Sequence, residues 1–209
     1  MKKLLLLFLV IPFLFAASPL QQKHLAVIAA LNNSSATCTS YEVQSSTSGW
    51  SFVGQNSNRG QIGTVYVAPA TVDVCKLVFS MYAVTATAAT YDYYAAIYTM
   101  NGTALNVRQG KSSAVTITQS DVAYDFLFAT SVPLTNGVSY GIVVFMDLDA
   151  NGEPDYDEGE VDYAGVRVNS SSVSPLDHAD EMLTGWRTDN SYWTEWSDYD
   201  VKIEVWTDQ

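Results

Sequence analysis

The chain has 209 residues, of which 48% are hydrophobic, 12% aromatic and 15% charged, and its formal net charge is −12. The length fits one sandwich or barrel domain, and the low charged fraction, with 13 Tyr and 5 Trp, excludes a disordered chain. Phosphate backbones repel a chain this acidic, so we expect no nucleic-acid partner. The acidity is uneven, because residues 147–209 hold 17 acids against three bases, whereas residues 18–146 are neutral overall.

The amino terminus has the pattern of a secretory signal. Lys2 and Lys3 precede 14 uncharged residues, from Leu4 to Ala17. That is the length of a signal-peptide apolar region and is shorter than the roughly 20 residues of a membrane-spanning helix. We therefore expect a signal peptide with a short helix over residues 1–17, and a mature protein that is secreted or held at the cell surface. An uncleaved anchor reaching Leu31 is the alternative, although polar residues 21–24 interrupt it.

The segment over residues 18–63 differs in composition from the rest of the chain. From Asn32 onward it is rich in Ser, Thr, Asn and Gly and has few apolar residues. This composition predicts a surface segment or linker with short strands over Ser40–Gln44 and Trp50–Val53.

Two cysteines, Cys38 and Cys75, are the only ones in the chain. Export to an oxidising compartment favours a disulfide between them, which would close a loop of about 37 residues and add a few kcal/mol of stability. Two buried free thiols are the alternative.

Residues 64–209 show the alternation of apolar and polar residues that is typical of β-strands. We expect strands over Val74–Val84, Tyr91–Met100, Ala123–Thr130, Ser139–Met146, Val161–Val168 and Val201–Thr207. Between them lie four dipeptides that favour turns: Asn101-Gly102, Gln109-Gly110, Asn136-Gly137 and Asn151-Gly152. No stretch after Leu31 keeps a helical period for three turns. The sequence therefore predicts an all-β domain over residues 64–209, built as a two-sheet antiparallel sandwich.

The order of segments over Gly63–Asp208 carries a resemblance to a known family. The chain reads VDVCKLVFSMYAV, then YYAAIYTMNGTALNVRQGKSSAVTI, then DFLFATSVPLTNGVSYGIVVFM, and it closes with WTEWSDYDVKIEVW. It resembles the jelly-roll sandwich domains appended to many secreted bacterial and phage-associated proteins, which are similar to carbohydrate-binding modules. The matching positions are Ile97-Tyr98, Asn101-Gly102, Leu134, Gly137, Tyr140, Trp196 and Asp200-Val201. The resemblance implies a jelly roll that binds carbohydrate.

An acidic loop follows the strand expected over 139–146. Its first twelve residues read DLDANGEPDYDE, with oxygen-bearing side chains at positions 1, 3, 5, 9 and 12 and glycine at position 6. This spacing suits one calcium ion, because alternate side chains converge on it, the glycine permits the tight turn and a final Glu can bind through both oxygens. Position 7 would contribute its backbone carbonyl. The predicted ligands are Asp147, Asp149, Asn151, Glu153, Asp155 and Glu158.

The loop is similar to EF-hand loops, and the Pro-Asp pair at positions 8 and 9 resembles the calcium-binding repeats of thrombospondin type 3. It differs from an EF-hand because the flanking segments are strands, so it reads as a single calcium loop inserted in a sandwich. Residues 147–162 contain eight acids and no base, whose mutual repulsion a cation would relieve. A solvated acidic loop without an ion is the alternative.

Aromatic residues crowd a short window near the carboxyl end. Trp186, Tyr192 and Trp193 lie among Thr, Asn and Ser, a composition that suits stacking and hydrogen bonding to sugar rings. Core packing is the alternative for each of them. Catalytic groups are harder to find: His178 lies among carboxylates, and no Gly-x-Ser-x-Gly motif or phosphate-binding loop is present.

The leading hypothesis from the sequence is a secreted, calcium-stabilised β-sandwich that binds carbohydrate or a cell-surface polymer. A structural or adhesive surface or filament subunit is the second, in which the chain assembles by strand pairing. A glycoside hydrolase is the third, because the acidic last third offers many carboxylates but no marked pair.

Overall fold

The computed structural model describes residues 38–43, 49–54, 60–102, 104–155, 162–169, 179–185, 193–196 and 200–208. The expected signal peptide and its helix lie outside these residues. Within them, no helix is long and apolar enough to cross a membrane. A short 3-10 turn, η1, spans Ala88–Thr90.

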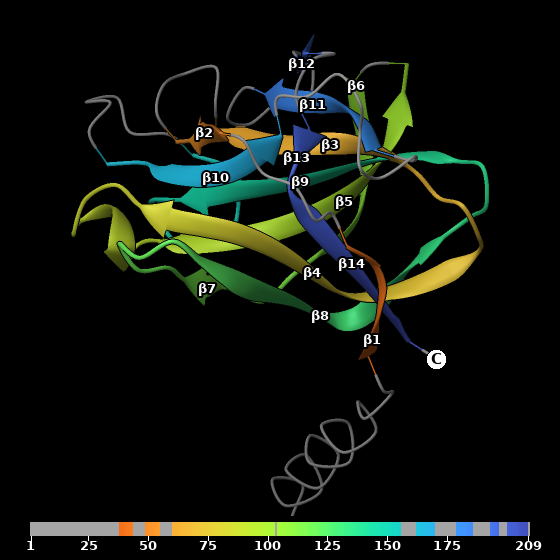
Figure 1. The fold of residues 1–209 in the computed structure, drawn as a ribbon, viewed down its shortest axis with the longest axis horizontal. Coiled ribbons are helices and arrows are strands. Elements are labelled where there is room, and N and C mark those ends of the chain that lie inside the picture. Colours follow the sequence, from red (N-terminus) through yellow and green to blue (C-terminus); the bar gives the residue numbers. More distant parts are fainter. Residues whose placement is uncertain are drawn as a thin grey trace, which may run out of the picture. The chain divides into compact units, whose positions relative to one another are not determined.

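Strands form nearly all of the regular structure in the described part of the chain (Figure 1). Their bounds are β1 Cys38–Val43, β2 Gly49–Val53, β3 Gln61–Val67, β4 Val72–Ala83, β5 Asp92–Asn101, β6 Ala104–Lys111, β7 Val115–Thr116, β8 Val122–Leu134, β9 Ser139–Asp147, β10 Ala164–Asn169, β11 Ala179–Gly185, β12 Trp193–Trp196, β13 Asp200–Val201 and β14 Ile203–Asp208. All of their pairings are antiparallel.

The strands form two sheets of seven strands each. In the first, called sheet A, the long strand β4 pairs with β8 on one side and with β14 and β10 on the other. Strand β1 extends this sheet from β14, and β2 and β13 pair with β10. In the second, called sheet B, the order is β12-β11-β3-β9-β5-β6, and β7 also pairs with β5.

The core lies between the two sheets, because strand residues alternate between faces. On β4, Leu77, Phe79 and Met81 are buried in the main core, while the residues between them face outward. On β9, Ile142, Val144 and Met146 join the same core. The sequence-based fold class, an all-β sandwich of two antiparallel sheets, is confirmed.

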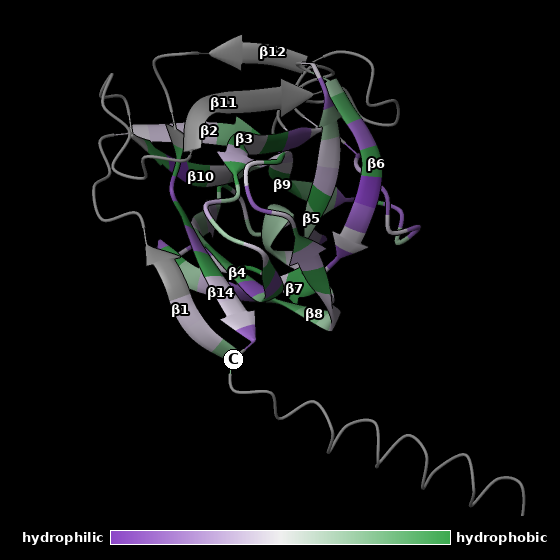
Figure 2. Ribbon diagram, turned by 90° about the vertical axis from the view of Figure 1, so that its right-hand side faces the viewer, coloured by the Kyte–Doolittle hydropathy of each residue, from purple (hydrophilic) through white to green (hydrophobic). Residues whose placement is uncertain are grey.

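Sheet B also carries a second apolar cluster on its outer face. Phe145 alternates with the core residue Met146 and belongs to this second cluster, with Val143, Ala96, Tyr98 and Leu105. Leu105 lies on the edge strand β6, which Figure 2 shows as hydrophobic near its start and hydrophilic over much of the rest.

Each expected strand overlaps strands of the structure, with Val201–Thr207 divided between β13 and β14, and Ser40–Gln44 and Trp50–Val53 overlap β1 and β2. These two strands pair with β14 and β10, although they precede residue 64, where we placed the domain boundary. That boundary stays a prediction.

One expected turn is wrong. Gln109 and Gly110 lie inside β6. A side chain at Gly110 would meet Val132 Cγ2 at 2.3 Å, so the glycine permits close approach to β8 rather than a turn. At the other three dipeptides the glycines do adopt positive φ, from 62° to 79°, as turns require.

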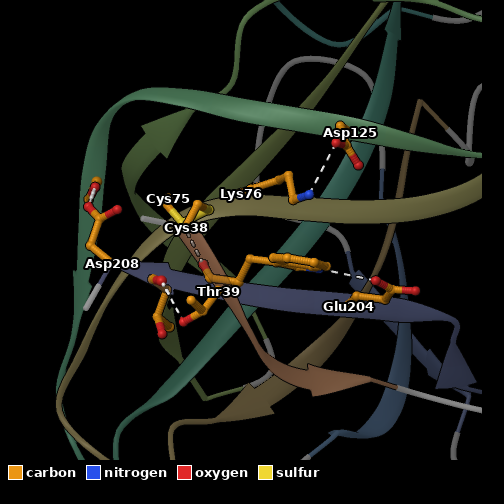
Figure 3. The surroundings of a disulfide bond; sticks show 10 residues. Cys38, Thr39, Cys75, Lys76, Asp125, Glu204 and Asp208 are labelled. Atoms are coloured by element: carbon orange, nitrogen blue, oxygen red, sulfur yellow. Dashed lines mark hydrogen bonds and ion pairs between the residues drawn. A yellow bond between two sulfur atoms is a disulfide. The ribbon is translucent and has the colours of Figure 1, made fainter. Parts of the chain in front are cut away.

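Cys38, at the start of β1, is disulfide-bonded to Cys75 in β4 (Figure 3). Their Cα atoms are 6.1 Å apart, and β14 pairs with both strands. The bond therefore fastens β1 to the central strand of sheet A where β14 ends. The predicted disulfide is confirmed, and the alternative of two free thiols is wrong.

Candidate metal centre

The acidic loop begins where β9 ends, at Asp147. Asp147 follows the core residue Met146, so it lies on the outer face of sheet B with Phe145. The chain then turns back on itself, and the Asp155 N–H donates to the Met146 carbonyl at 2.8 Å. This closure brings positions 1 and 9 of the loop together.

Side-chain oxygens hold the loop backbone around them. Asp147 Oδ2 accepts a hydrogen bond from the Gly152 N–H at 2.7 Å, and Asp155 Oδ2 accepts one from the Leu148 N–H at 3.2 Å. Two further bonds lie in the same loop: Asp149 Oδ1 accepts from the Asn151 N–H at 3.1 Å, and Asn151 Oδ1 accepts from the Glu153 N–H at 2.7 Å. The left-handed φ of Gly152, 79°, lets the backbone curl in this way.

Three carboxylates converge in this loop. Asp147, Asp149 and Asp155 each offer an oxygen, and these oxygens lie within 4.8 Å of one another. Burial raises the pKa of the Asp155 carboxyl, and the charges of Asp149 and Asp147 raise it further. Carboxylates that repel one another at this range are the arrangement that a cation stabilises.

Asp147 provides a second, independent sign of a missing partner. The residue is 2% exposed, and within the described part of the chain its Oδ1 is buried without a hydrogen bond. A buried carboxylate oxygen without a partner is costly, and it is rare in folded proteins. A cation bound by Asp147 would supply that partner.

Two cations on β6 fasten the loop to sheet B. Arg108 donates two hydrogen bonds to the Glu153 carboxylate, at 2.7 and 2.8 Å, and Lys111 Nζ donates to the Gly152 carbonyl at 2.6 Å. The Arg108 hydrogen bond holds the pKa of Glu153 below its usual value. Lys111 Nζ also lies 4.5 Å from the ring centroid of Tyr94 on β5. These contacts fix the middle of the loop on the strands beside it.

The predicted ligands fall into three groups. Asp147, Asp149 and Asp155 come together, as the spacing predicted. The Glu153 side chain turns to Arg108, which leaves its backbone carbonyl for the role expected at position 7. Asn151 is exposed and its side-chain oxygen caps the turn, while Glu158 lies outside the described residues.

The sequence reasoning missed Arg108 and Lys111. Both lie about 40 residues before the loop, and their strand contains the Gln109-Gly110 pair that we read as a turn. The signal that could have found them is their charge, because they are two of the five bases between residues 18 and 146.

The predicted aromatic ligand residues are not tested. Trp186 and Tyr192 lie outside the described residues, and for Trp193 the structure describes the backbone in β12 alone. There Trp193 pairs with Gly185 of β11, which pairs with Gln61 of β3. These three residues stay predictions.

Comparison with known proteins gives little further information. No protein-family model matches the chain, and no curated protein matches it. A solved structure of the cysteine protease and lectin-like domains of Cwp84, a surface layer associated protein of Clostridium difficile, is similar at 12% identity with a TM-score of 0.46. The match covers 71% of this chain and 32% of that one, so the chain spans about a third of its length.

Proposed function

We propose that this protein is a secreted binding module whose β-sandwich is stabilised by calcium. The observation that carries the proposal is the buried Oδ1 of Asp147, which has no hydrogen-bond partner among the described residues and lies beside two further carboxylates. Every side chain expected at the ion offers oxygen, and calcium takes six to eight oxygen ligands in flexible geometry. The set contains no histidine or cysteine, the ligands that zinc prefers in structural sites.

The proposed location outside the cell has separate support. The protein has a disulfide between Cys38 and Cys75, and structural disulfides persist in oxidising compartments. The residues before it have the pattern of a secretory signal. Extracellular calcium is also abundant enough for sites of modest affinity.

The proposed ligand is a carbohydrate or another cell-surface polymer. Its support is the aromatic window of Trp186, Tyr192 and Trp193, together with the resemblance described above. The metal loop lies at the end of β9, in the same sheet as Trp193. Calcium would then stabilise the sheet that contains the backbone of Trp193.

Thermal unfolding with calcium and with chelator tests the metal proposal. A ligand at 100 times its Kd adds about 2.7 kcal/mol, which is about 5–10 °C for a domain of this size. We expect calcium to raise the Tm by that amount and magnesium to raise it less. Equal melts in calcium and chelator, with no heat of binding in a calorimetric titration, would contradict the proposal.

Asp155 gives the pH dependence of the same site a definite sign. Its pKa is raised in the metal-free fold, so the protonated carboxyl stabilises that fold. This contribution to stability is present below the usual pKa of 3.8 and is lost as the pH rises through the raised pKa. Calcium competes with the proton. The Tm difference between calcium and chelator should therefore grow as pH rises from about 4 to 7.

The variant Asp155→Asn should remove this dependence. An asparagine oxygen can still accept from the Leu148 N–H, so the loop should keep its shape without the charge. We expect a higher Tm than wild type in chelator at pH 7 and a smaller calcium increment. Exposed Asp73 on β4, changed to Asn, is the matched control. A lower Tm in chelator for Asp155→Asn would show that its charge does not strain the metal-free loop.

A further inference from the structure

The outer face of sheet A carries the same small group of side chains twice. In the first group, Lys76 Nζ lies 3.7 Å from the ring centroid of Trp206 and 3.1 Å from Asp125 Oδ2. Figure 3 shows Lys76 reaching toward Asp125. A lysine is thus held between an indole ring and a carboxylate.

The second group repeats this chemistry with an arginine. The Arg167 guanidinium lies 3.8 Å from the ring centroid of Trp50, and its Nε donates to Asp121 Oδ2 at 3.0 Å. Tyr82 adds a ring whose centroid is 4.5 Å from that of Trp50. We call these two sets the indole–cation–aspartate groups.

Strand register places both groups on one face. Lys76 pairs with Trp206, Arg167 pairs with Trp50, and Tyr82 pairs with Gly165, two positions before Arg167 on β10. The alternate residues of these strands are buried in the core, so all of these side chains project to the outside of sheet A. Gly165 leaves room there for the Tyr82 ring, because a Cβ would meet that ring at 2.1 Å.

The face is elongated along β4. Lys76 and Tyr82 are six residues apart on this strand, which corresponds to about 20 Å. Trp50, Tyr82 and Trp206 are each half-buried, so none of the three residues is enclosed in the core. Beside the first group, Leu127 pairs with Lys76 and is 54% exposed. Two aromatic contacts this far apart suit an extended molecule better than a small one.

The charges of the face select the chemistry of its partner. Both cations are already paired with aspartates, and the Lys76 side chain is 12% exposed. The Asp125 side chain is 57% exposed, and Glu204 adds a further carboxylate that accepts from Trp206 Nε1. Lys202 lies between the buried residues Val201 and Ile203, beside Arg167, and adds a third cation to this face. The three cations balance the carboxylates of Asp121, Asp125 and Glu204, so an anionic polymer meets no net attraction here. Hydroxyl groups, in contrast, can donate to the carboxylates while the C–H faces of sugar rings stack on the aromatic rings.

We propose that the outer face of sheet A binds a neutral, linear polysaccharide that runs obliquely across β4 and β10 from Trp206 to Trp50. The inference rests on the proposed binding function and adds the ligand class and its surface. This surface lies on the opposite sheet from the metal loop and from Trp193. The two indole–cation–aspartate groups act as two contact points for one chain.

Affinity electrophoresis in native gels tests the proposal. The probes are hydroxyethyl cellulose, xylan and galactomannan as neutral polymers, and carboxymethyl cellulose as the anionic counterpart of the first. We expect at least one neutral polymer to retard the protein, carboxymethyl cellulose to retard it at least tenfold less, and short oligosaccharides to compete weakly. Retardation by none of the neutral polymers, or equal retardation by both celluloses, overturns the proposal.

Variants locate the site. Trp50→Ala and Trp206→Ala should each weaken retardation about tenfold, and the double variant should abolish it. Leu127 is exposed, so Leu127→Glu removes apolar surface beside Lys76 without disturbing the core and should also weaken binding if an alanine variant fails to fold. Calcium affinity should stay within twofold of wild type in all of them.

The controls separate this proposal from the proposed function. If Trp193→Ala loses polysaccharide binding and the sheet A variants keep it, the proposed sheet A surface is wrong. The proposed binding function is then still supported. An unchanged Tm in calcium overturns the metal role, whatever the glycan results. Retention of full binding in the Trp50→Ala, Trp206→Ala double variant shows that the two groups only stabilise the sheet.

Discussion

Replacing Asp147 by asparagine is expected to lower calcium affinity about a hundredfold, which corresponds to ~3 kcal/mol. Asp147 is the most buried of the three clustered carboxylates, and it supplies the oxygen that has no partner among the described residues. An asparagine retains the oxygen that accepts from the Gly152 N–H, so the turn should survive. The amide loses one unit of negative charge at the ion, and ligand charge strongly tunes calcium affinity.

The same variant should be more stable than wild type when calcium is removed. The buried Oδ1 has no partner among the described residues, which destabilises the metal-free fold, and the amide removes the negative charge. Calorimetric titration gives the affinity, and thermal melts in chelator give the stability. Asp73→Asn, which removes an exposed charge on β4, should change neither quantity. Wild-type affinity in Asp147→Asn would mean that the three carboxylates do not hold calcium.

The sequence predicted the features of this protein that depend on neighbours along the chain. The alternation over 139–146 places Met146 in the core, and the next residue, Asp147, falls on the opposite face at the start of the loop. Oxygen-bearing side chains at every second position, with Gly152 at the sixth, then form a turn whose carboxylates converge. Local spacing determines these positions, so a single sequence was enough.

The features that the sequence did not predict depend on contacts between distant strands. Arg108 meets Glu153 across 45 positions, and Arg167 meets Asp121 across 46. Strand register sets such pairs, and no local pattern contains it. The role of Gly110 also depends on a distant strand. Glycine after a polar residue favours a turn, yet here the missing side chain lets Val132 of β8 pack against the backbone. The aromatic groups of sheet A were equally hidden, because Trp50 and Tyr82 become neighbours only after β10 pairs with both β2 and β4.

Removing the disulfide between Cys38 and Cys75 should lower the stability of the fold substantially. Cys38 and Cys75 are 37 positions apart, and opening a loop of that length destabilises a fold by about 3–4 kcal/mol in the chain-entropy model. For a domain of this size we expect the Cys38→Ser, Cys75→Ser double variant to lose about 10 °C in Tm. Wild type in a reducing agent should melt at the same temperature as the variant.

The cause of that loss is testable, because the disulfide acts mainly on the unfolded chain. Without the bond the unfolded chain is more extended and exposes more surface, so the slope of the unfolding free energy against denaturant should increase. The folded protein should change at one place: within the described residues β1 pairs with β14, and the disulfide fastens it to β4 through Cys75. Amide hydrogens of β1 should therefore exchange faster in the variant. Those of β4 and β9 should lose only as much protection as the lower global stability accounts for. Equal exchange in β1 and an unchanged Tm would show that pairing with β14 is enough to hold this strand, and that the disulfide contributes little to the fold.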